Sequence, residues 1–334
     1  MVSQGLVNSL IILVLACFIA GRVAASSYSV TDFGAKGDGV TDDTKAFLDT
    51  WNATCRSSGP SILLIPAGKT FLLNPIVFQG PCQFYIRVQR SSSCSLLLHA
   101  FSSFGFFRSN AQLVPTAQVA GLRLINSPRM HLVVGFSSTI RITGLTITAP
   151  GDSPNTDGIH IEQSRNVIVS DSTIGDDCIS IGTASFHVNV SWVTCGPGHG
   201  ISVGSLGMDN SRAEVSDIQG GYGYANRIIF ENINFTAVMN PIIIDQHYCP
   251  ATVCAEKPSA VQVSDVRFIE ARGTSSSQVA INFNCSQNVA CTGITIQNVE
   301  IQPAQQGGQA SSYCFNAHGT VTGVAKPAVP CLMP

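Results

Sequence analysis

The amino-acid sequence predicts an all-β protein built as a parallel β-helix, a solenoid in which each turn adds short strands to those of its neighbours. Apolar residues recur in short bursts separated by Gly, Asn and Asp. From about residue 119 the bursts return at intervals in the twenties: Ile140 to Val167 spans 27 residues, and Val167 to Val188 spans 21. Such a period is typical of a repeat architecture. The 30 glycines and the short β-branched runs also favour strands over helices.

A sandwich of antiparallel sheets is the alternative all-β fold, and it needs hairpin turns. The favoured two-residue turns are Asn-Gly and Asp-Gly, which occur here only at Asp38-Gly39 and Asp157-Gly158. The scarcity of these turns favours the β-helix.

The N-terminus predicts a secretory signal peptide over residues 1–25. An apolar run from Leu10 to Ala20 is followed by the small-residue pattern Val23-Ala24-Ala25, so we expect the mature chain to start at Ser26. The run is too short for a comfortable membrane span, although an N-terminal anchor is the alternative. We then expect residues 26–334 to form a single β-helix domain that is secreted to the extracellular space.

Cysteines and glycosylation sequons agree with an extracellular chain. Oxidised cysteines are typical of secreted proteins, and the short-range candidate pairs are Cys55 with Cys82, Cys178 with Cys195, Cys249 with Cys254, Cys285 with Cys291, and Cys314 with Cys331. Connectivity cannot be deduced from the sequence, and Cys94 is left over. Sequons for N-glycosylation stand at Asn52, Asn189, Asn234 and Asn284.

One helix is predicted near the start of the mature chain. Thr41-Asp42-Asp43 offers a cap and first-turn acids, and apolar or small residues follow at helical spacing at Ala46, Phe47, Trp51, Thr54 and Cys55. We expect this helix to cap the open end of the solenoid, because an uncovered sheet edge invites aggregation.

Two stretches depart from the repeat. Residues 83–115 carry a serine run and Phe101, Phe104, Phe106 and Phe107 without a period, so we expect an anomalous segment that stands outside the coil pattern. The second departure is the interval from Val190 to Ile228, which has no strand burst after Ile218 where another coil is expected.

Charge limits the classes of partner. The formal net charge is −2, and only 11% of residues are charged, so no basic field attracts a nucleic acid. Any acidic ligand needs locally placed Lys or Arg. We expect no nucleic-acid partner, no membrane contact after signal removal, and a monomer.

Three motifs carry the chemistry: Asn155-Thr156-Asp157, Gly175-Asp176-Asp177 and Gly198-His199-Gly200. Asp157 and Asp177 are 20 positions apart, and Asp177 and His199 are 22 apart, which is one predicted coil each. Since neighbouring strands lie about 4.7–4.9 Å apart, we expect three carboxylates and an imidazole in one column. Glycoside hydrolysis needs one protonated carboxyl group and one carboxylate, and like charges in one site keep one group protonated.

Each motif alone has a simpler interpretation. Asn-Thr-Asp-Gly and Gly-Asp-Asp are ordinary turn sequences, a lone histidine is usually a hydrogen-bonding group, and Asp-rich coils could hold Ca²⁺. Their occurrence in order, at one-coil intervals, favours an active site.

These motifs resemble a known family. NTDGIHI (155–161), GDDCISIG (175–182) and CGPGHGISVGSLG (195–207) resemble a polygalacturonase of glycoside hydrolase family 28, most closely the secreted plant branch. VTDFGAKGDGVTDDTKAF (30–47), NPIIIDQHYC (240–249) and the C-terminal cysteines resemble that branch as well. The resemblance covers roughly residues 28–82 and 119–334. It implies a right-handed parallel β-helix that cleaves the α-1,4 bonds of pectin (polygalacturonate) with inversion, in cell-wall remodelling, without a metal or other cofactor.

The resemblance also implies roles for individual residues. Asp176 resembles the general acid, while Asp157 and Asp177 resemble the pair that binds and activates water. His199 is similar to the histidine that supports the acid. Tyr248 stands where a substrate-contacting tyrosine is expected, and we expect Asn155 to bind substrate as well.

One family motif, Arg-Ile-Lys, is missing between Glu214-Val215-Ser216 and Gly220-Gly221-Tyr222-Gly223. The motif supplies cations for the substrate carboxylate, a task that suits arginine. Arg212 and Arg227 are nearby candidates, although neither matches the context of the motif. The missing length is about one coil, which a solenoid can lose and restack. We hypothesise a splice form, a faulty gene model or a decayed copy.

Three functions follow from the sequence. The first is an active pectin hydrolase, the second is a weak or inactive β-helix that binds pectin, and the third is a Ca²⁺-dependent pectate lyase.

Overall fold

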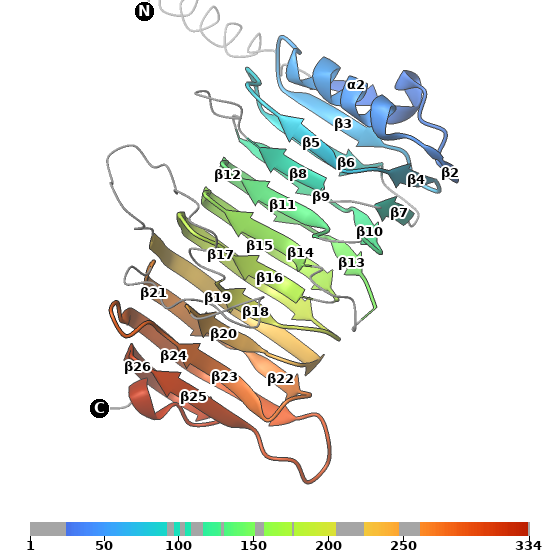
Figure 1. Cartoon of the computed structure of the whole chain (residues 1–334). Coiled ribbons are helices and arrows are strands. Elements are labelled where there is room, and N and C mark those ends of the chain that lie inside the picture. The colour runs from blue at the N-terminus through green and yellow to red at the C-terminus, as the bar shows by residue number, and fades with distance from the viewer. Residues whose placement is uncertain are drawn as a thin grey trace, which may run out of the picture.

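The computed structural model describes residues 25–91, 97–100, 104–107, 116–127, 130–150, 157–175, 177–204, 224–246 and 261–332, with the backbone alone at 97–100, 104–107 and Asp177. Its strands lie parallel and stack as successive coils of one solenoid (Figure 1). The predicted right-handed parallel β-helix is confirmed.

One face of the solenoid is a sheet to which each coil adds one strand, and neighbours in sequence order are neighbours in space. The strands of this first sheet are β5 (Ile76–Gln79), β8 (Phe104–Phe107), β11 (Leu132–Gly135), β14 (Asp157–Glu162), β16 (Asp177–Ile181), β18 (Ile201–Val203), β20 (Ile242–Asp245), β23 (Val279–Asn284) and β25 (Ser311–Phe315).

The second sheet wraps the other faces. Its strands are β1 (Ser26–Ser29), β2 (Asp38–Asp42), β3 (Ser61–Ile65), β4 (Thr70–Leu73), β6 (Ile86–Arg90), β7 (Leu97–Ala100), β9 (Ala117–Ala120), β10 (Arg123–Ile125), β12 (Ser138–Thr143), β13 (Thr146–Thr148), β15 (Arg165–Ile174), β17 (Ser185–Cys195), β19 (Tyr224–Val238), β21 (Gln262–Ile269), β22 (Arg272–Ser275), β24 (Cys291–Pro303) and β26 (Ala317–Lys326). The short 3₁₀ helices η1 (Val30–Phe33) and η3 (Pro330–Leu332) lie near the ends.

The core consists of columns of identical or similar side chains. Ile159, Ile179, Ile201, Ile242 and Ile281 are register partners in five successive strands of the first sheet. None of the five is more than 1% exposed. Burying such a side chain stabilises the fold by about 1.5–3 kcal/mol. The alternation of these residues with polar ones fixes which side chains of each strand face outward.

The long strands of the second sheet bend at equivalent points in successive coils. Asn166, His187, Arg227 and Asp265 all have left-handed φ values, between 50° and 55°. Their flanking residues stay in register, for example Val167 with Val188. Asn and Asp adopt this conformation at modest cost, and the bend lets one strand cover two faces of the solenoid.

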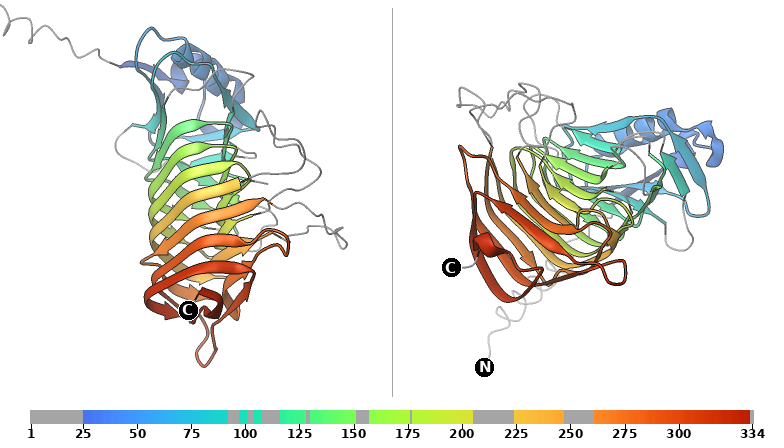
Figure 2. Two further views of the ribbon diagram at one scale, coloured as in Figure 1. Left: turned by 90° about the vertical axis from the view of Figure 1, so that its left-hand side faces the viewer. Right: turned by 60° about the horizontal axis from the view of Figure 1, so that its bottom comes forward.

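Helix α2 (Thr44–Cys55) covers the N-terminal end of the stack (Figure 2). The ring of Trp51 stacks on Phe78 at 4.5 Å, and Phe47 meets Phe71 edge-on at 5.3 Å. The predicted capping helix is therefore present. Its start differs from the prediction, because Asp42 and Asp43 precede the first turn. The Asp43 carboxylate accepts hydrogen bonds from the backbone N–H groups of Lys36 and Gly37 instead.

The described part of residues 83–115 does not stand outside the coil pattern. Strand β6 pairs with β3 and β9, and β8 pairs with β5 and β11. Ile86 and Val88 face the core with alternating polar neighbours. The polar residues between these short strands hide the period in the sequence. Cys94 lies outside the described residues.

The described strands on either side of residues 205–223 pair with each other, without an additional coil between them. Strand β17 pairs directly with β19, through Val188 and Ile228, and β18 pairs directly with β20, through Ile201 and Ile242. A hydrogen-bonded pair leaves no room for a strand between its members. The solenoid is therefore continuous at the point where the sequence predicts a missing coil, and residues 205–223 lie outside the described part.

Four of the five candidate cysteine pairs are disulfides: Cys55–Cys82, Cys178–Cys195, Cys285–Cys291 and Cys314–Cys331. The fifth, Cys249 with Cys254, lies outside the described residues, as does most of the predicted signal peptide. In the part of the chain that the structure covers, no helix has the length and apolar character needed to cross a membrane.

Candidate active site

The predicted column starts at the amino ends of consecutive strands in the first sheet. Asp157 opens β14 and Asp177 opens β16, and the two residues are register partners. His199 precedes Ile201 by two residues, and Ile201 pairs with Ile179, which follows Asp177 by two. Three of the predicted site residues therefore stand at one level of three successive coils. Asp176, Asn155 and Tyr248 lie outside the described residues, as does the Asp177 side chain.

The turn that carries His199 packs directly against the next coil. A Cβ atom on Gly200 would overlap the carbonyl oxygens of Asn240 and Pro241, and one on Gly196 would overlap that of Thr236. Gly196 also has a φ of 109°. Glycine is required at both positions because backbone approaches backbone. The glycines of this motif therefore have a packing role, and they fix the position of the His199 backbone.

The Asp157 side chain lies in a polar network that the sequence analysis missed. Its Oδ2 atom accepts a hydrogen bond from the hydroxyl of Ser180 and lies 3.2 Å from Nδ1 of His160. That same Nδ1 atom is 2.6 Å from the Ser180 oxygen. On the other side of the ring, His160 Nε2 is 3.6 Å from a carboxylate oxygen of Glu162.

The electrostatics of His160 follow from these contacts. Burial disfavours the charged ring, but hydrogen bonds to Asp157 and Glu162 and the charges of both carboxylates outweigh it and raise the pKa of His160 to about 9. The same hydrogen bond from His160 lowers the pKa of Glu162. At neutral pH the ring is thus an imidazolium between two carboxylates.

A second histidine, His131, lies behind Asp157 in the preceding coil. Its backbone N–H donates to the Asp157 carbonyl oxygen at 2.8 Å, and its Nε2 accepts from the Ser127 backbone N–H. The side chain is fully buried, and burial lowers the pKa of His131 to about 4. The ring is therefore neutral at pH 7 and supports the coil on which Asp157 begins.

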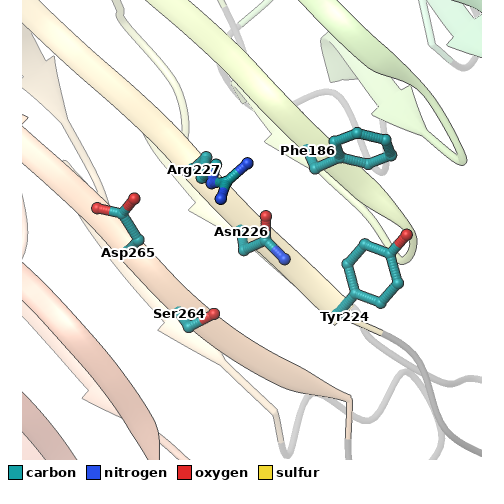
Figure 3. A pocket seen from close by; sticks show the side chains of 6 residues that line it. All are labelled: Phe186, Tyr224, Asn226, Arg227, Ser264 and Asp265. Carbon is teal, nitrogen blue, oxygen red and sulfur yellow. The ribbon is translucent and has the colours of Figure 1, made fainter.

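Arg227, one of the two candidate cations, does not lie at this column. Figure 3 shows it beside a pocket of about 520 Å³ that is also lined by Phe186 and Tyr224. Its Nη1 atom is 2.9 Å from Nε2 of His187. Phe186 follows the carboxyl end of β16, whereas Asp177 begins that strand, so the pocket and the column lie at opposite ends of the strand. Arg212 lies outside the described residues.

Across the residues that the structure describes, no group of three or more His, Cys, Asp and Glu side chains is arranged to hold a metal ion.

Comparison with known families gives a match along most of the chain. The family described as "Glycosyl hydrolases family 28" matches residues 108–221 and 218–325. A second family, "Rhamnogalacturonase A/epimerase, pectate lyase-like", matches residues 27–87.

Two relatives illustrate the similarity. A "Probable polygalacturonase" of Arabidopsis thaliana is 37% identical, covering 91% of this chain and 83% of the relative. A "Polygalacturonase" of Malus domestica is also 37% identical, covering 92% and 81%. The alignment with the Arabidopsis protein has 371 positions, whereas 91% of 334 residues is about 304, so about 67 positions have no counterpart in this chain.

Solved structures agree at the level of the fold. The endo-xylogalacturonan hydrolase from Aspergillus tubingensis has a TM-score of 0.54 and 19% identity, covering 90% of this chain and 100% of that one. The polygalacturonase from Erwinia carotovora has a TM-score of 0.53 and 16% identity, covering 90% and 97%.

Proposed function

The chain belongs to glycosyl hydrolase family 28, and on that premise we propose that it hydrolyses the α-1,4-galacturonosidic bonds of polygalacturonate. The observation that carries the proposal is the register of Asp157 with Asp177, with His199 at the same level of the next coil. This register puts two aspartate positions and one histidine position at the amino ends of three adjacent strands. Aspartate chemistry of this kind needs no cofactor.

In the proposed reaction Asp176 donates a proton to the leaving oxygen, while Asp157 and Asp177 bind and activate a water molecule. Attack from the opposite side of the sugar inverts the anomeric centre, which requires carboxyl groups about 6.5–9.5 Å apart. Strands of adjacent coils lie about 4.7–4.9 Å apart, so the proposed mechanism requires the aspartate side chains to diverge and leave room for the water between them. His199 supports the acid, and Asn155 and Tyr248 contact the substrate.

The setting that we propose is extracellular. The N-terminal signal sequence, the disulfides and the sequons support secretion, and the polygalacturonase names of the plant relatives support pectin of the cell wall as the substrate. We expect the mature protein to be a monomer.

A second candidate function is a weak or inactive β-helix that binds pectin. It is favoured by the direct pairing of β18 with β20 and of β17 with β19, which leaves no coil for an Arg-Ile-Lys motif at this point of the stack. About 67 aligned positions without a counterpart agree with the loss of such a segment. A uronate beside three aspartates then lacks its cationic partner.

The experiment that separates the two is release of reducing ends from polygalacturonate by the purified protein. The enzyme predicts release that Asp176→Asn abolishes, with products of inverted configuration by proton NMR. If the protein only binds pectin, its release of reducing ends does not exceed that of buffer, and pectin pulls down Asp176→Asn as well as the wild type. Unsaturated products absorbing in the ultraviolet, lost with a chelator, would identify a lyase instead.

A further inference from the structure

His160 is placed to act on Asp157 through two routes. It approaches the Asp157 carboxylate directly, at 3.2 Å, and it contacts the Ser180 hydroxyl that donates to the same oxygen, Oδ2. His160 and Ser180 are register partners on β14 and β16. The contact is therefore built into the pairing of the two strands that carry the aspartates.

The donors and acceptors of the network have one consistent direction. The single hydroxyl proton of Ser180 is donated to Asp157, so the Ser180 oxygen accepts from Nδ1–H of His160. Nε2 faces the carboxylate of Glu162, which accepts only. Both ring nitrogens thus carry protons, and the ring is a cation.

Among the side chains that the structure describes on the two adjacent strands, the register partners of His160 are uncharged. On β14 the ring faces Asp157 and Glu162. Its register partner on β16 is Ser180 and on β11 is Val133, neither of which is charged. His160 and Asp157 are each only 15% exposed at the side chain, so water screens their interaction weakly.

We propose that His160 and Ser180 are positioning residues for Asp157. They hold its Oδ2 atom, which keeps the carboxyl group ionised and fixes its orientation. A nearby cation favours the charged form of a carboxyl group, and a carboxylate that activates water has to be charged. This role rests on the hydrolytic role of Asp157 proposed above. It adds His160 from the coil of Asp157 and Ser180 from the next coil.

The first test is independent of activity. Imidazole ¹H–¹⁵N spectra of the full-length protein would follow His160, with His160→Gln identifying its signals. Both nitrogens should remain protonated at pH 7.5 in the wild type, where burial disfavours the charged ring but two carboxylates outweigh it and raise the pKa of His160 to about 9. Asp157→Asn and Glu162→Gln should each move the transition to lower pH. A neutral ring at pH 7.5, insensitive to Asp157→Asn, would overturn the proposal even for an inactive protein.

The second test uses hydrolysis. Because His160→Gln removes the cation, the acidic limb of the kcat profile should move up by about one pH unit or more, with KM little changed. Ser180→Ala should lower kcat at the plateau by about tenfold, because an unrestrained carboxylate is misaligned. The matched control is His187→Gln, an exposed strand histidine bonded to Asn166 and Arg227, which should leave the profile unchanged.

The two proposals fail in different ways. A folded His160→Gln variant with an unchanged acidic limb and wild-type kcat would contradict the role of His160 while leaving the hydrolase intact. A wild-type protein without hydrolysis would contradict the proposed function, and the imidazole spectra would still decide whether His160 holds Asp157.

Discussion

At the residue scale, the buried His131 makes the stability of the protein depend on pH. The unfolded chain carries a histidine of ordinary pKa, 6.5, whereas burial lowers the pKa of the folded residue to about 4. Above pH 6.5 both states hold the ring neutral. As the pH falls from 6.5 toward 4, the unfolded state binds a proton that the folded state excludes, so the unfolding free energy declines.

We therefore predict that His131→Asn, which keeps a hydrogen-bond acceptor but does not titrate, loses less stability than the wild type between pH 6.5 and 4.5. Denaturant midpoints at the two pH values measure the difference. His318→Asn, at an exposed position, should behave like the wild type. Equal losses in the wild type and His131→Asn would show that His131 takes up its proton in the folded state too.

The sequence predicts the motif residues of the site, but not the network around Asp157. The 20-residue interval places Asp157 level with Asp177, as the register confirms. The same interval also pairs His160 with Ser180, which could have been found by extending the register three residues along the strand. The contact between Asp157 and His160, three residues apart on the same strand, depends on side-chain geometry that the spacing of the motifs does not define.

At the element scale, the glycine turn before β18 is held by the coil that follows it. We predict that Gly200→Ala destabilises the protein by about 1–3 kcal/mol, as overpacking against a rigid neighbour does, because its Cβ would overlap the backbone of Asn240 and Pro241. Denaturant unfolding measures the cost. In Gly175→Ala the new Cβ has no neighbour closer than 3.6 Å, so that control should stay near the wild type. Equal costs would contradict the packing role.

The capping helix provides a second prediction at this scale. Trp51 is 2% exposed and stacked on Phe78, whereas Trp192 is 63% exposed. Trp51→Ala should cost about 3–5 kcal/mol, while Trp192→Ala should be close to neutral. Thermal unfolding compares them, and tryptophan fluorescence of each single variant reports on the remaining ring. Equal losses of stability would contradict a structural cap.

The sequence predicts the presence of helix α2 correctly because its apolar spacing is regular, but it predicts the first residue of the helix less accurately. The Asp43 carboxylate accepts hydrogen bonds from the backbone N–H groups of Lys36 and Gly37. Helix propensity does not predict such a contact with a preceding loop. The strands within residues 83–115 were missed for a related reason. Strands of four or five residues carry too few apolar positions to show a period, and their pairing with neighbouring coils supplies the stability.

At the scale of the whole molecule, the register explains how the solenoid stays continuous across the long interval between Ile201 and Ile242. Each coil contacts only its neighbours, so β18 can pair with β20 while the hydrophobic columns continue without interruption. Periodicity in the sequence predicts the architecture, since many of the described strands alternate buried residues with more exposed ones. It does not predict which coils pair across the long interval between Ile201 and Ile242, because the intervening residues show no strand pattern.

The pairing of β18 with β20 affects two parts of the proposed site differently: the acid–base residues, and the cations that would bind the substrate carboxylate. The acid–base residues stand on coils that precede the pairing of β18 with β20, whereas the cations that the family resemblance leads us to expect would come from the interval between Ile201 and Ile242. The fold is therefore compatible with an intact acid–base column that binds a uronate with reduced strength. Activity with a raised KM is the outcome that this arrangement predicts for an enzyme.

The most direct measurement is the release of reducing ends from polygalacturonate by the purified wild-type protein and by Asp176→Asn, assayed together with His187→Gln as a folded control. We expect release by the wild type and by His187→Gln, and a loss of at least about a hundredfold for Asp176→Asn, since general acid catalysis contributes about 10²–10⁴-fold. Release no greater than that of buffer, with Asp176→Asn indistinguishable from the wild type, would contradict the proposed hydrolysis.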